Sequence, residues 1–507
     1  MSFLAAAVSL AVLSACGSEQ EPMVDRPKVT AFAEHESTRV GARLAELAAE
    51  HPDKSGFGII RYGQPALAAR LALCDLAEKS LDVQYYIWEA DPTGRLLAER
   101  LARAAERGVR VRVLVDDINM SGRDDRIGAL DAHPNIEIRI FNPFKHRKFR
   151  ALDFALDMGR INHRMHNKMM IMDNAVSLVG GRNVGAHYFE AHTESNFRDL
   201  DIVGAGPVVR ETSEVFDHFW NGPWAVPSKE VVGKSFTVAE YEDAVGDMRR
   251  QISEDEYPFP TEQSASAMLE SLEEIFAGLV WATGEIVWDD PAEIYEGFKR
   301  GRIGEGLFDR IETLEKELLI ESAYFVPRDD GVAAAKALVD RGVRVRILTN
   351  SLSANDVLAA HAGYSKYRKP LLEAGVELYE LRPYPGPVEK QIVSAKSKAA
   401  LHTKAIVFDR KDVFIGSFNL DPRSGSINTE AGIYVQSPEL AAQVIDYMNE
   451  GVAPENAFRV VLDDNDDLRW IIEKDGVRLD YDTDPNSTWF QRRLVGLIRL
   501  LPVEKQL

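Results

Sequence analysis

One stretch of sequence occurs twice, and this repetition constrains the fold more than any other feature. Each copy reads His-x-Lys-x-x-x-x-Asp and is followed, six residues later, by two small residues, any residue and Asn. A single copy would carry little weight because short patterns arise by chance, whereas two copies with the same downstream spacing indicate a duplicated functional element. The matching residues are His166, Lys168, Asp173 and Asn183 in the first copy, and His402, Lys404, Asp409 and Asn419 in the second.

The alternation of side chains along a strand fixes which of these residues share a face. The His and the Lys of each copy are two residues apart and point the same way. Asp173 and Asp409 have the opposite parity, so they are expected to point away from the chemistry and to act as structural or supporting groups. The apolar runs 169–172 and 405–408 predict strands that are buried on both sides.

Small residues follow each predicted strand, at 180–181 and at 416–417. They are expected to let the backbone turn tightly, so that Asn183 and Asn419 return to the site. Lys ammonium groups and Asn amides would then supply donors to the non-bridging oxygens of one phosphodiester. One imidazole can attack phosphorus, while the other exchanges a proton with the departing and incoming alcohols.

The paired motif resembles that of the phospholipase D superfamily, whose members use two such motifs in one active site. Several further blocks are similar to bacterial cardiolipin synthases, and to the C-type clade most closely. The resemblance implies that His166 is the nucleophile and that His402 is the acid–base. It covers most of the chain. The blocks that carry it lie at 81–88, 108–117, 141–144, 165–168, 348–357, 361–381 and 416–430.

The resemblance implies a phosphatidyltransferase that forms a phosphohistidine intermediate and passes its phosphatidyl group to a hydroxyl, giving cardiolipin. The expected partners are phospholipids at a membrane surface, with phosphatidylglycerol as acceptor and phosphatidylethanolamine as one candidate donor. Two alternatives stay open: a phospholipase D-type hydrolase that releases phosphatidic acid, and a phosphodiesterase or nuclease of the same superfamily. No cofactor or metal ion is expected, because four donors would surround the phosphate and no metal-ligand spacing lies near the motifs.

The rest of the chain repeats the same plan. The sequence Arg-Gly-Val-Arg-Val-Arg begins at residue 107 and again 234 residues later, and the two motif His are 236 residues apart. An internal duplication at this spacing predicts two similar domains that meet at a pseudo-twofold axis. The alignment also places Asp199 opposite Glu430, each about thirty residues after its motif His. A carboxylate there can hydrogen-bond the rear nitrogen of an imidazole and fix its tautomer, the alternative being a surface or structural role.

Strand and helix patterns alternate through both halves, which predicts an α/β fold. We expect two tandem phospholipase D-like domains, each a mixed β-sheet flanked by helices, with one shared active site. The region between the domains receives no substrate role from its sequence. The expected divisions are 1–16 (lipoprotein signal), 17–55 (tether and helix), 56–225 (first domain, motif 161–188), 226–300 (bridge or insert), 301–455 (second domain, motif 397–424) and 456–507 (acidic β-meander and C-terminal amphipathic helix).

The first residues are similar to a bacterial lipoprotein signal. A short apolar segment, 3–15, ends in Leu-Ser-Ala-Cys-Gly and is too short to span a bilayer as a stable helix. This pattern predicts lipidation of Cys16 and a membrane-anchored lipoprotein of the bacterial cell envelope, facing the periplasm. The segment lacks the usual positive charge at its start, and the alternative is an ordinary apolar N-terminus. Cys74 lies in an apolar helical pattern and fits a buried thiol.

The net charge of −20 makes a nucleic-acid partner unexpected. Two segments indicate a membrane surface instead. A basic, aromatic segment at 145–150 precedes the first motif, and it either holds anionic lipid headgroups or is a solvated loop. A basic, amphipathic helix at 489–502 either lies in a membrane interface or covers the domain core. The sequence does not indicate an oligomeric state.

Overall fold

The computed structural model describes residues 26–262, 273–295, 301–384 and 397–501. Cys16 and the expected lipoprotein signal therefore lie outside the described residues. Helices and strands alternate through the first half, as the sequence predicts. Its elements are α1 (Arg39–Ala49), β1 (Ser55–Ile60), α2 (Gly63–Leu76), β2 (Ser80–Tyr85), α3 (Pro92–Glu106), β3 (Arg110–Asp116), α4 (Asp124–Leu130), β4 (Ile136–Phe141), α5 (Arg150–Leu156), α6 (Met158–Ile161), β5 (Met169–Met172), β6 (Val176–Gly180), β7 (Ser195–Arg198), β8 (Asp201–Ala205), α7 (Pro207–Asn221) and β9 (Ala225–Pro227).

The second half begins after a connecting region that contains α8 (Ser228–Val232), α9 (Val238–Glu254), β10 (Val280–Trp288) and α11 (Pro291–Tyr295). It repeats the alternation of the first half. Its elements are α12 (Arg302–Glu312), β11 (Glu317–Ser322), α13 (Arg328–Asp340), β12 (Arg344–Asn350), α14 (Leu358–Ser365), α15 (Arg368–Glu373), β13 (Glu377–Leu381), β14 (Lys398–Leu401), β15 (Lys404–Phe408), β16 (Asp412–Gly416), α16 (Pro422–Ser426), β17 (Ala431–Gln436), α17 (Pro438–Gly451), β18 (Ala457–Leu462), β19 (Leu468–Lys474), β20 (Val477–Tyr481) and α18 (Trp489–Ile498).

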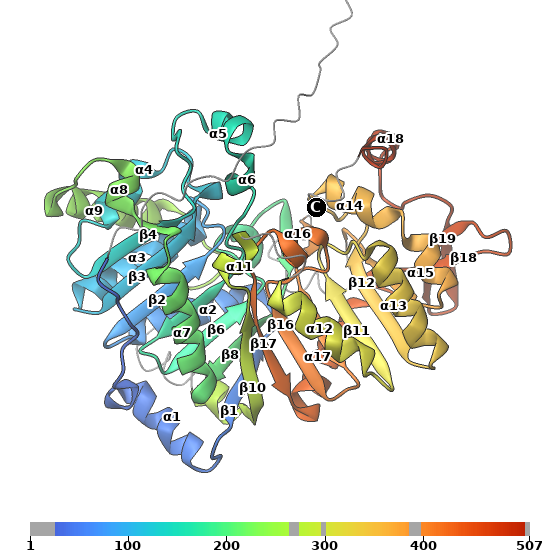
Figure 1. The fold of residues 1–507 in the computed structure, drawn as a ribbon, viewed down its shortest axis with the longest axis horizontal. Coiled ribbons are helices and arrows are strands. Elements are labelled where there is room, and N and C mark those ends of the chain that lie inside the picture. Colours follow the sequence, from blue (N-terminus) through green and yellow to red (C-terminus); the bar gives the residue numbers. More distant parts are fainter. Residues whose placement is uncertain (1–25, 263–272, 296–300, 385–396, 502–507) are drawn as a thin grey trace, which may run out of the picture.

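The two halves share one strand order. In the first half the order is β4-β3-β2-β5-β6-β8, and in the second it is β13-β12-β11-β15-β16-β17. Three parallel strands lead into three antiparallel strands in both halves. The prediction of two tandem mixed-sheet domains is confirmed, and Figure 1 shows them side by side, the first in blue and green and the second in yellow and orange.

Strand β10 joins the two sheets into one. Its first residues pair antiparallel with β1, from Val280 opposite Phe57 to Ala282 opposite Ser55. Its later residues pair antiparallel with β17, ending at Trp288 opposite Ala431. The sequence analysis did not identify this strand. Its Gly284 and Glu285 interrupt the apolar alternation, because part of the strand is only half-buried.

The motif strands lie at the centre of three apolar clusters. Met170 and Met172 of β5 face the first-half cluster, whereas Met169 and Ile171 face a cluster built from both halves. In β15 the same alternation divides its side chains between the shared cluster and the second-half cluster. Helices α7 and α17 complete the shared cluster. The prediction of strands buried on both sides is confirmed, and the shared cluster fixes the two motifs relative to each other.

The C-terminal segment extends the second half. Strand β18 pairs with β13, and β19 and β20 continue the sheet as a meander. Helix α18 packs on α14 through Val495, with Ile498 partly buried beside it. The apolar face expected from the sequence is therefore divided, since Phe490, Leu497 and Leu501 remain exposed. None of the helices in the described ranges is long and apolar enough to cross a membrane.

Candidate active site

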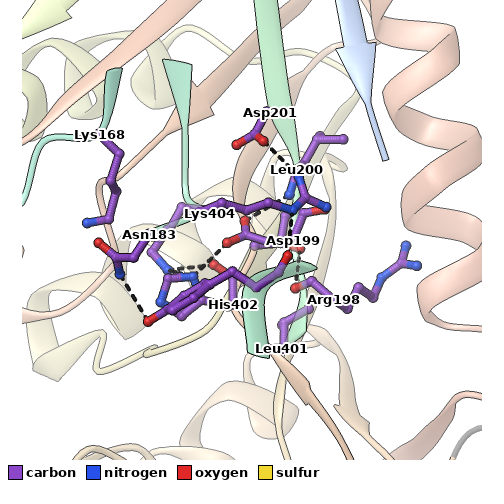
Figure 2. Close-up of polar contacts among 12 residues, drawn as sticks. Lys168, Asn183, Arg198, Asp199, Leu200, Asp201, Leu401, His402 and Lys404 are labelled. Atoms are coloured by element: carbon purple, nitrogen blue, oxygen red, sulfur yellow. Dashed lines mark hydrogen bonds and ion pairs between the residues drawn. The ribbon is translucent and has the colours of Figure 1, made fainter. Parts of the chain in front are cut away.

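The two motif histidines lie in one site, and each contacts a carboxylate from the opposite half. His166 Nδ1 lies 2.8 Å from Glu430 Oε2, and His402 Nδ1 lies 2.6 Å from Asp199 Oδ2. Figure 2 shows the second of these pairs, with Lys404 beside it. Both histidines are nearly buried, and both carboxylates are fully buried. Neither half alone supplies both the motif His and the carboxylate that it contacts.

Backbone hydrogen bonds between the halves produce this crossed arrangement. The amide of His166 donates to the carbonyl of Thr429, the residue before Glu430. The amide of His402 donates to the carbonyl of Arg198, the residue before Asp199. Strands β7 and β14 pair in parallel at the second contact. Main-chain hydrogen bonds thus place each motif imidazole beside the carboxylate of the opposite half.

A second pair of equivalent residues fixes the chain just before each histidine. Asp116, at the end of β3, accepts from the amide of Met165 at 2.9 Å. Asn350, at the end of β12, accepts from the amide of Leu401 at 2.7 Å and donates to its carbonyl at 2.8 Å. Asp116 is also paired with the buried Arg164. These residues hold the histidine-bearing segments against the carboxyl ends of the parallel strands.

Two lysines give the site its positive charge. Lys168 and Lys404 are fully buried, and each donates to the backbone carbonyl of its own motif His. Burial lowers the pKa of Lys404 to about 8, against the attraction of Asp199. Burial lowers the pKa of Lys168 well below its usual range, with Glu430 opposing that shift. A bound anion would stabilise the charged form of both lysines.

Burial also shifts the other ionisable groups of the site. Burial, assisted by the nearby lysines, lowers the pKa of His166 and His402 well below the usual range of imidazole. Burial raises the pKa of Glu430 to about 7, partly offset by Lys168. Burial also raises the pKa of Asp199. Burial thus favours the neutral form of both imidazoles, and the carboxylate at each Nδ1 favours the tautomer with its proton on Nδ1 and its lone pair on Nε2.

Comparison with known proteins agrees with this geometry. The family model described as cardiolipin synthase, PLD-like domain matches residues 71–220 and 307–451, one match in each half. Cardiolipin synthase C of Escherichia coli (strain K12) is 39% identical over 472 residues, which cover 92% of this chain and 99% of that protein. The chain belongs to the cardiolipin synthase, phospholipase D-like family.

Other similar proteins support the family and the fold. An uncharacterized protein of Helicobacter pylori (strain ATCC 700392 / 26695) is 30% identical, covering 92% of both chains. The crystal structure of phosphatidylserine synthase from Haemophilus influenzae Rd KW20 matches with a TM-score of 0.54 at 16% identity, covering 81% of this chain and 90% of that one. At that identity the structural match supports the fold alone.

The two amide side chains of the repeated motif, Asn183 and Asn419, differ in their contacts. Asn183 accepts from the amide of Ile87 at 3.0 Å and donates to the hydroxyl of Tyr188 at 3.0 Å. The Oδ1 of Asn419 is buried without a hydrogen-bond partner in the described chain. Both amides lie in the buried interior that holds the histidines. Within this interior, Asn419 Oδ1 is therefore an acceptor that lacks a hydrogen-bond donor in the described chain.

The motif aspartates of this phospholipase D-like chain point away from the histidines. Asp173 accepts from the backbone amides of residues 78–80 at 2.7–2.9 Å, and so holds the turn that leads into β2. Asp409 accepts from the amides of residues 315–317 before β11. Each carboxylate thus ties its motif strand to the adjacent parallel strand, which is a structural role.

The small residues after the motif strands lie where the chain bends, at 181 and 417, and they also lie against close neighbours. Gly180, Gly181 and Gly416 have no left-handed backbone conformation. They are needed because neighbouring atoms approach closely. A Cβ on Gly181 would lie 2.3 Å from Asp199 Oδ1, and one on Gly416 would lie 2.5 Å from the carbonyl of Ala431. The motif therefore makes room for the carboxylate strands.

Two serines of the second half were not identified as site residues from the sequence. Ser417 donates to Glu430 Oε2 at 2.5 Å, and Ser424 donates to Glu430 Oε1 at 2.7 Å. Both bonds stabilise the ionised carboxylate. Ser417 occupies the position of Gly181 in the first half. The sequence shows this difference between the two motifs. Its explanation, that Asp199 and Glu430 have side chains of different length, required the three-dimensional structure.

Aromatic rings that the motif does not contain cover both imidazoles. The ring of Tyr86 lies 4.9 Å from that of His166, and Lys168 lies over the same ring. The rings of Tyr188 and Phe197 lie 5.1 and 5.2 Å from that of His402. Tyr86 belongs to block 81–88, which carried the family resemblance. Its place in that block, directly after β2, was the one indication in the sequence that it lies in the site.

The basic segment before the first motif is largely neutralised within the chain. Arg147 is paired with Asp117 and Asp124, and Arg150 is paired with Asp117. This segment was expected either to hold anionic lipid headgroups or to be a solvated loop, and its arginines are engaged by Asp117, just after β3, and by Asp124 of α4. Among the described residues, no group of three or more His, Cys, Asp or Glu side chains is arranged to hold a metal ion.

The close approach at Gly181 generates a prediction. The substitution Gly181→Ser, which copies Ser417 of the other half, is expected to displace Asp199 from His402, because the new Cβ has no space. We expect kcat to fall by about 10²-fold or more, as when the carboxylate that orients a catalytic imidazole is lost. Gly425→Ser is the matched control, since no atom lies within 4 Å of a Cβ there. Unchanged kcat in Gly181→Ser would contradict the role given to Asp199.

Proposed function

We propose that this chain is a phosphatidyltransferase that makes cardiolipin through a phosphohistidine intermediate. The observation that carries the proposal is the pair of neutral, buried imidazoles, each backed by a carboxylate from the opposite half and flanked by a lysine. The 39% identity to a cardiolipin synthase along nearly the whole chain supports the same activity. Its name supplies the product, which the geometry alone does not specify.

In the proposed first step, His166 is the nucleophile. Its Nδ1–H donates to Glu430, which leaves the Nε2 lone pair to attack phosphorus. The bond from phosphorus to the headgroup alcohol breaks, and that alcohol takes a proton from His402. The products of the step are a phosphatidyl group bound to His166 and the free alcohol. Lys168 and Lys404 stabilise the negative charge on the non-bridging oxygens.

The charge balance among the buried groups of the site explains how His402 acquires that proton. Lys168 and Lys404 carry two positive charges and Asp199 and Glu430 two negative charges when all four are ionised, so the buried set is neutral. A phosphodiester adds one negative charge. Uptake of one proton restores neutrality, and the anion offsets the lysines that hold the pKa of His402 low. Substrate binding thereby creates the general acid.

In the proposed second step, a hydroxyl attacks the phosphohistidine while His402 takes its proton. With the terminal glycerol hydroxyl of phosphatidylglycerol as acceptor, the product is cardiolipin and His166 is released. With water, the product is phosphatidic acid. The hydrolase reading therefore differs only in the acceptor. The nuclease reading is disfavoured by the net charge of −20.

Product analysis tests the proposed activity. The purified protein would be incubated with labelled phosphatidylglycerol, with and without phosphatidylethanolamine, and the lipids separated. We expect cardiolipin, with free glycerol or ethanolamine identifying the donor. In the same assay, His166→Ala is expected to lower turnover by about 10³-fold or more. Phosphatidic acid alone would favour the hydrolase, and plasmid cleavage without lipid turnover would favour the nuclease.

The distinct roles of the two histidines can be separated with an activated donor. Phosphatidyl-p-nitrophenol has a leaving group that departs without a proton. We expect His402→Ala to release one equivalent of nitrophenol and to accumulate an alkali-stable phosphatidyl protein, whereas His166→Ala forms none. The opposite pattern would exchange the two assignments.

The shifted pKa values predict a narrow pH optimum. Protonation of Glu430, with its pKa of about 7, removes the anionic acceptor behind His166, so kcat/KM falls as the pH decreases. Deprotonation of Lys404, with its pKa of about 8, removes a phosphate donor, so kcat/KM falls as the pH increases. We expect a bell-shaped profile between these values. Lys404→Arg should move the part of the alkaline limb that Lys404 sets to higher pH, because guanidinium stays protonated. An unmoved limb would assign it to another group.

The proposal includes docking on a membrane surface. Most exposed large apolar side chains of the described residues lie on two segments, and Figure 1 shows α5 and α18 at one edge of the molecule, with α6 and α16 between them. Helix α6 leads to His166, and α16 carries Ser424, so this edge is also the edge of the site. The exposed residues are Phe149, Leu152, Phe154, Leu156 and Met158 around α5, and Trp489, Phe490, Leu497, Leu500 and Leu501 around α18.

Vesicle sedimentation tests this docking surface. The double substitution Trp489→Ser and Phe490→Ser is expected to weaken binding to phosphatidylglycerol vesicles at least about tenfold, because two exposed aromatic side chains lose contact with lipid. Val477→Ser with Leu479→Ser on β20 is the control. Equal losses in both would refute the assignment. Lipidation of Cys16 in the cell envelope belongs to the same proposal, and Cys16→Ala should abolish palmitate labelling in cells.

A further inference from the structure

The connecting strand β10 ends beside the carboxylate that contacts His166. Its last residue, Trp288, pairs with Ala431 of β17, and Asp289 follows directly. The amide of Asp289 donates to the carbonyl of Glu430 at 3.1 Å, and the amide of Glu430 donates to Asp289 Oδ2 at 3.2 Å. Asp289 therefore binds both main-chain polar groups of Glu430.

The side chain of Asp289 is fully buried, and both of its oxygens accept from main-chain amides. Oδ2 accepts from Glu430, while Oδ1 accepts from Ile303 at 3.1 Å, in the first turn of α12. The space around it is tight, since a Cβ on Gly301 would lie 2.6 Å from Oδ1. A buried carboxyl is costly unless its oxygens are hydrogen-bonded, so these amides and this space fix one position for it.

The main chain of Glu430 decides where its carboxylate lies relative to the imidazole. Glu430 Oε2 lies 2.8 Å from His166 Nδ1, and Thr429, the preceding residue, accepts from the amide of His166 at 2.8 Å. The amide and carbonyl of Glu430 itself are both bound by Asp289. A rotation of this stretch of main chain would move the carboxylate away from Nδ1, and small displacements of a reacting group have large effects on rate.

The first half holds its own carboxylate differently. Strand β1 pairs with β8 as β10 pairs with β17, and continuing both registers places Tyr62 opposite Asp199 where Asp289 lies opposite Glu430. The carbonyl of Asp199 accepts instead from the guanidinium of the buried Arg182. The carboxyl group behind Glu430 thus belongs to one side of the site, and it comes from the connecting region rather than from either repeat.

From these contacts we infer that Asp289 is a positioning residue for the proposed reaction. It fixes the main chain of Glu430, so that Glu430 holds His166 with Nε2 directed at phosphorus. The inference rests on the proposed function, because it takes His166 as the nucleophile. Attack by His166 depends on this direction, whereas in the second step His166 is the group that departs. Loss of Asp289 should therefore slow formation of the phosphohistidine more than its transfer.

Phosphatidyl-p-nitrophenol separates the two steps. In Asp289→Ala the first equivalent of nitrophenol should appear at least about tenfold more slowly, because Nε2 is misdirected. Decay of the phosphatidyl protein should stay within about twofold of the wild type, since an interaction needed in one step does not limit the other. Asp289→Asn, which can still accept one amide, should lie between. An unchanged first step, or equal slowing of both steps, would overturn the inference.

The neighbouring residue provides a matched control. Asp290 accepts from the amide of Ala292 at 2.9 Å, and an asparagine can do the same. Asp290→Asn should therefore leave both steps as they are in the wild type. An equal loss in Asp290→Asn and Asp289→Asn would show that the effect is not specific to the residue that binds Glu430, and would also overturn the inference.

A second variant separates this role from that of a helix cap. Asp289 binds the first turn of α12, whose N-cap residue is Gly301. The three atoms nearest to a Cβ on Gly301 belong to the Asp289 carboxylate, and Asp289→Ala removes them. A serine at the N-cap can accept from the first turn of its helix. Asp289→Ala with Gly301→Ser should regain the Tm lost in Asp289→Ala but not the rate of the first step. Recovery of both would reduce Asp289 to a cap.

The tautomer of His166 gives a readout that needs no lipid. In protein labelled with 15N-histidine, two-bond couplings report which ring nitrogen carries the proton. We expect His166 to carry it on Nδ1 in the wild type and to be a mixture of tautomers in Asp289→Ala, with His402 unchanged. An unchanged His166 would overturn the inference even if the protein makes cardiolipin. If the tautomer changes but the wild type turns over no lipid, the proposed function fails while the positioning of Glu430 stands.

Discussion

The structure depends on two hydrogen bonds that cross between the halves. Each motif imidazole meets a carboxylate that the other half supplies, and the adjacent main-chain amide bonds the residue before that carboxylate. A duplicated chain could in principle place a complete His–carboxylate pair in each half. Crossing the pairs makes the site exist only when the halves are docked. The shared apolar cluster and β10 stabilise that docking, so folding and assembly of the site are one event.

Electrostatics explains why such a polar site can be buried. The two lysines and two carboxylates around the imidazoles leave no net charge among themselves when all are ionised, which limits the cost of removing them from water. Burial still shifts the pKa values of Lys404 and Glu430. A bound phosphodiester changes this balance by one charge. The same desolvation that keeps both imidazoles neutral in the empty site thus makes proton uptake follow substrate binding.

Sequence reasoning predicted the mixed sheets, the duplicated halves and the alternation of β5 and β15, because these follow from local periodicity and spacing. It also found Asp199 and Glu430 by aligning the repeats, but the alignment could not reveal which histidine each carboxylate serves. That depends on packing between segments more than 200 residues apart. The small residues at 180–181 were attributed to a turn of the chain, and the structure adds a second reason for them, the close approach of a carboxylate. The ion pairs of the basic segment could not be predicted, because its acidic partners lie elsewhere in the sequence.

Duplication also limits what the repeated parts can specify. Both halves bring the same His, Lys and Asn, so the motifs provide phosphodiester chemistry but treat two lipids alike. Asymmetry enters through departures from the repeat. Asp199 beside Gly181 and Glu430 beside Ser417 give the two imidazoles different supports, and only Glu430 receives two serine hydroxyls. Helix α9, in the connecting region, has no counterpart among the described elements of the second half. A chain that must distinguish a donor lipid from an acceptor lipid has its means of doing so in these unrepeated elements.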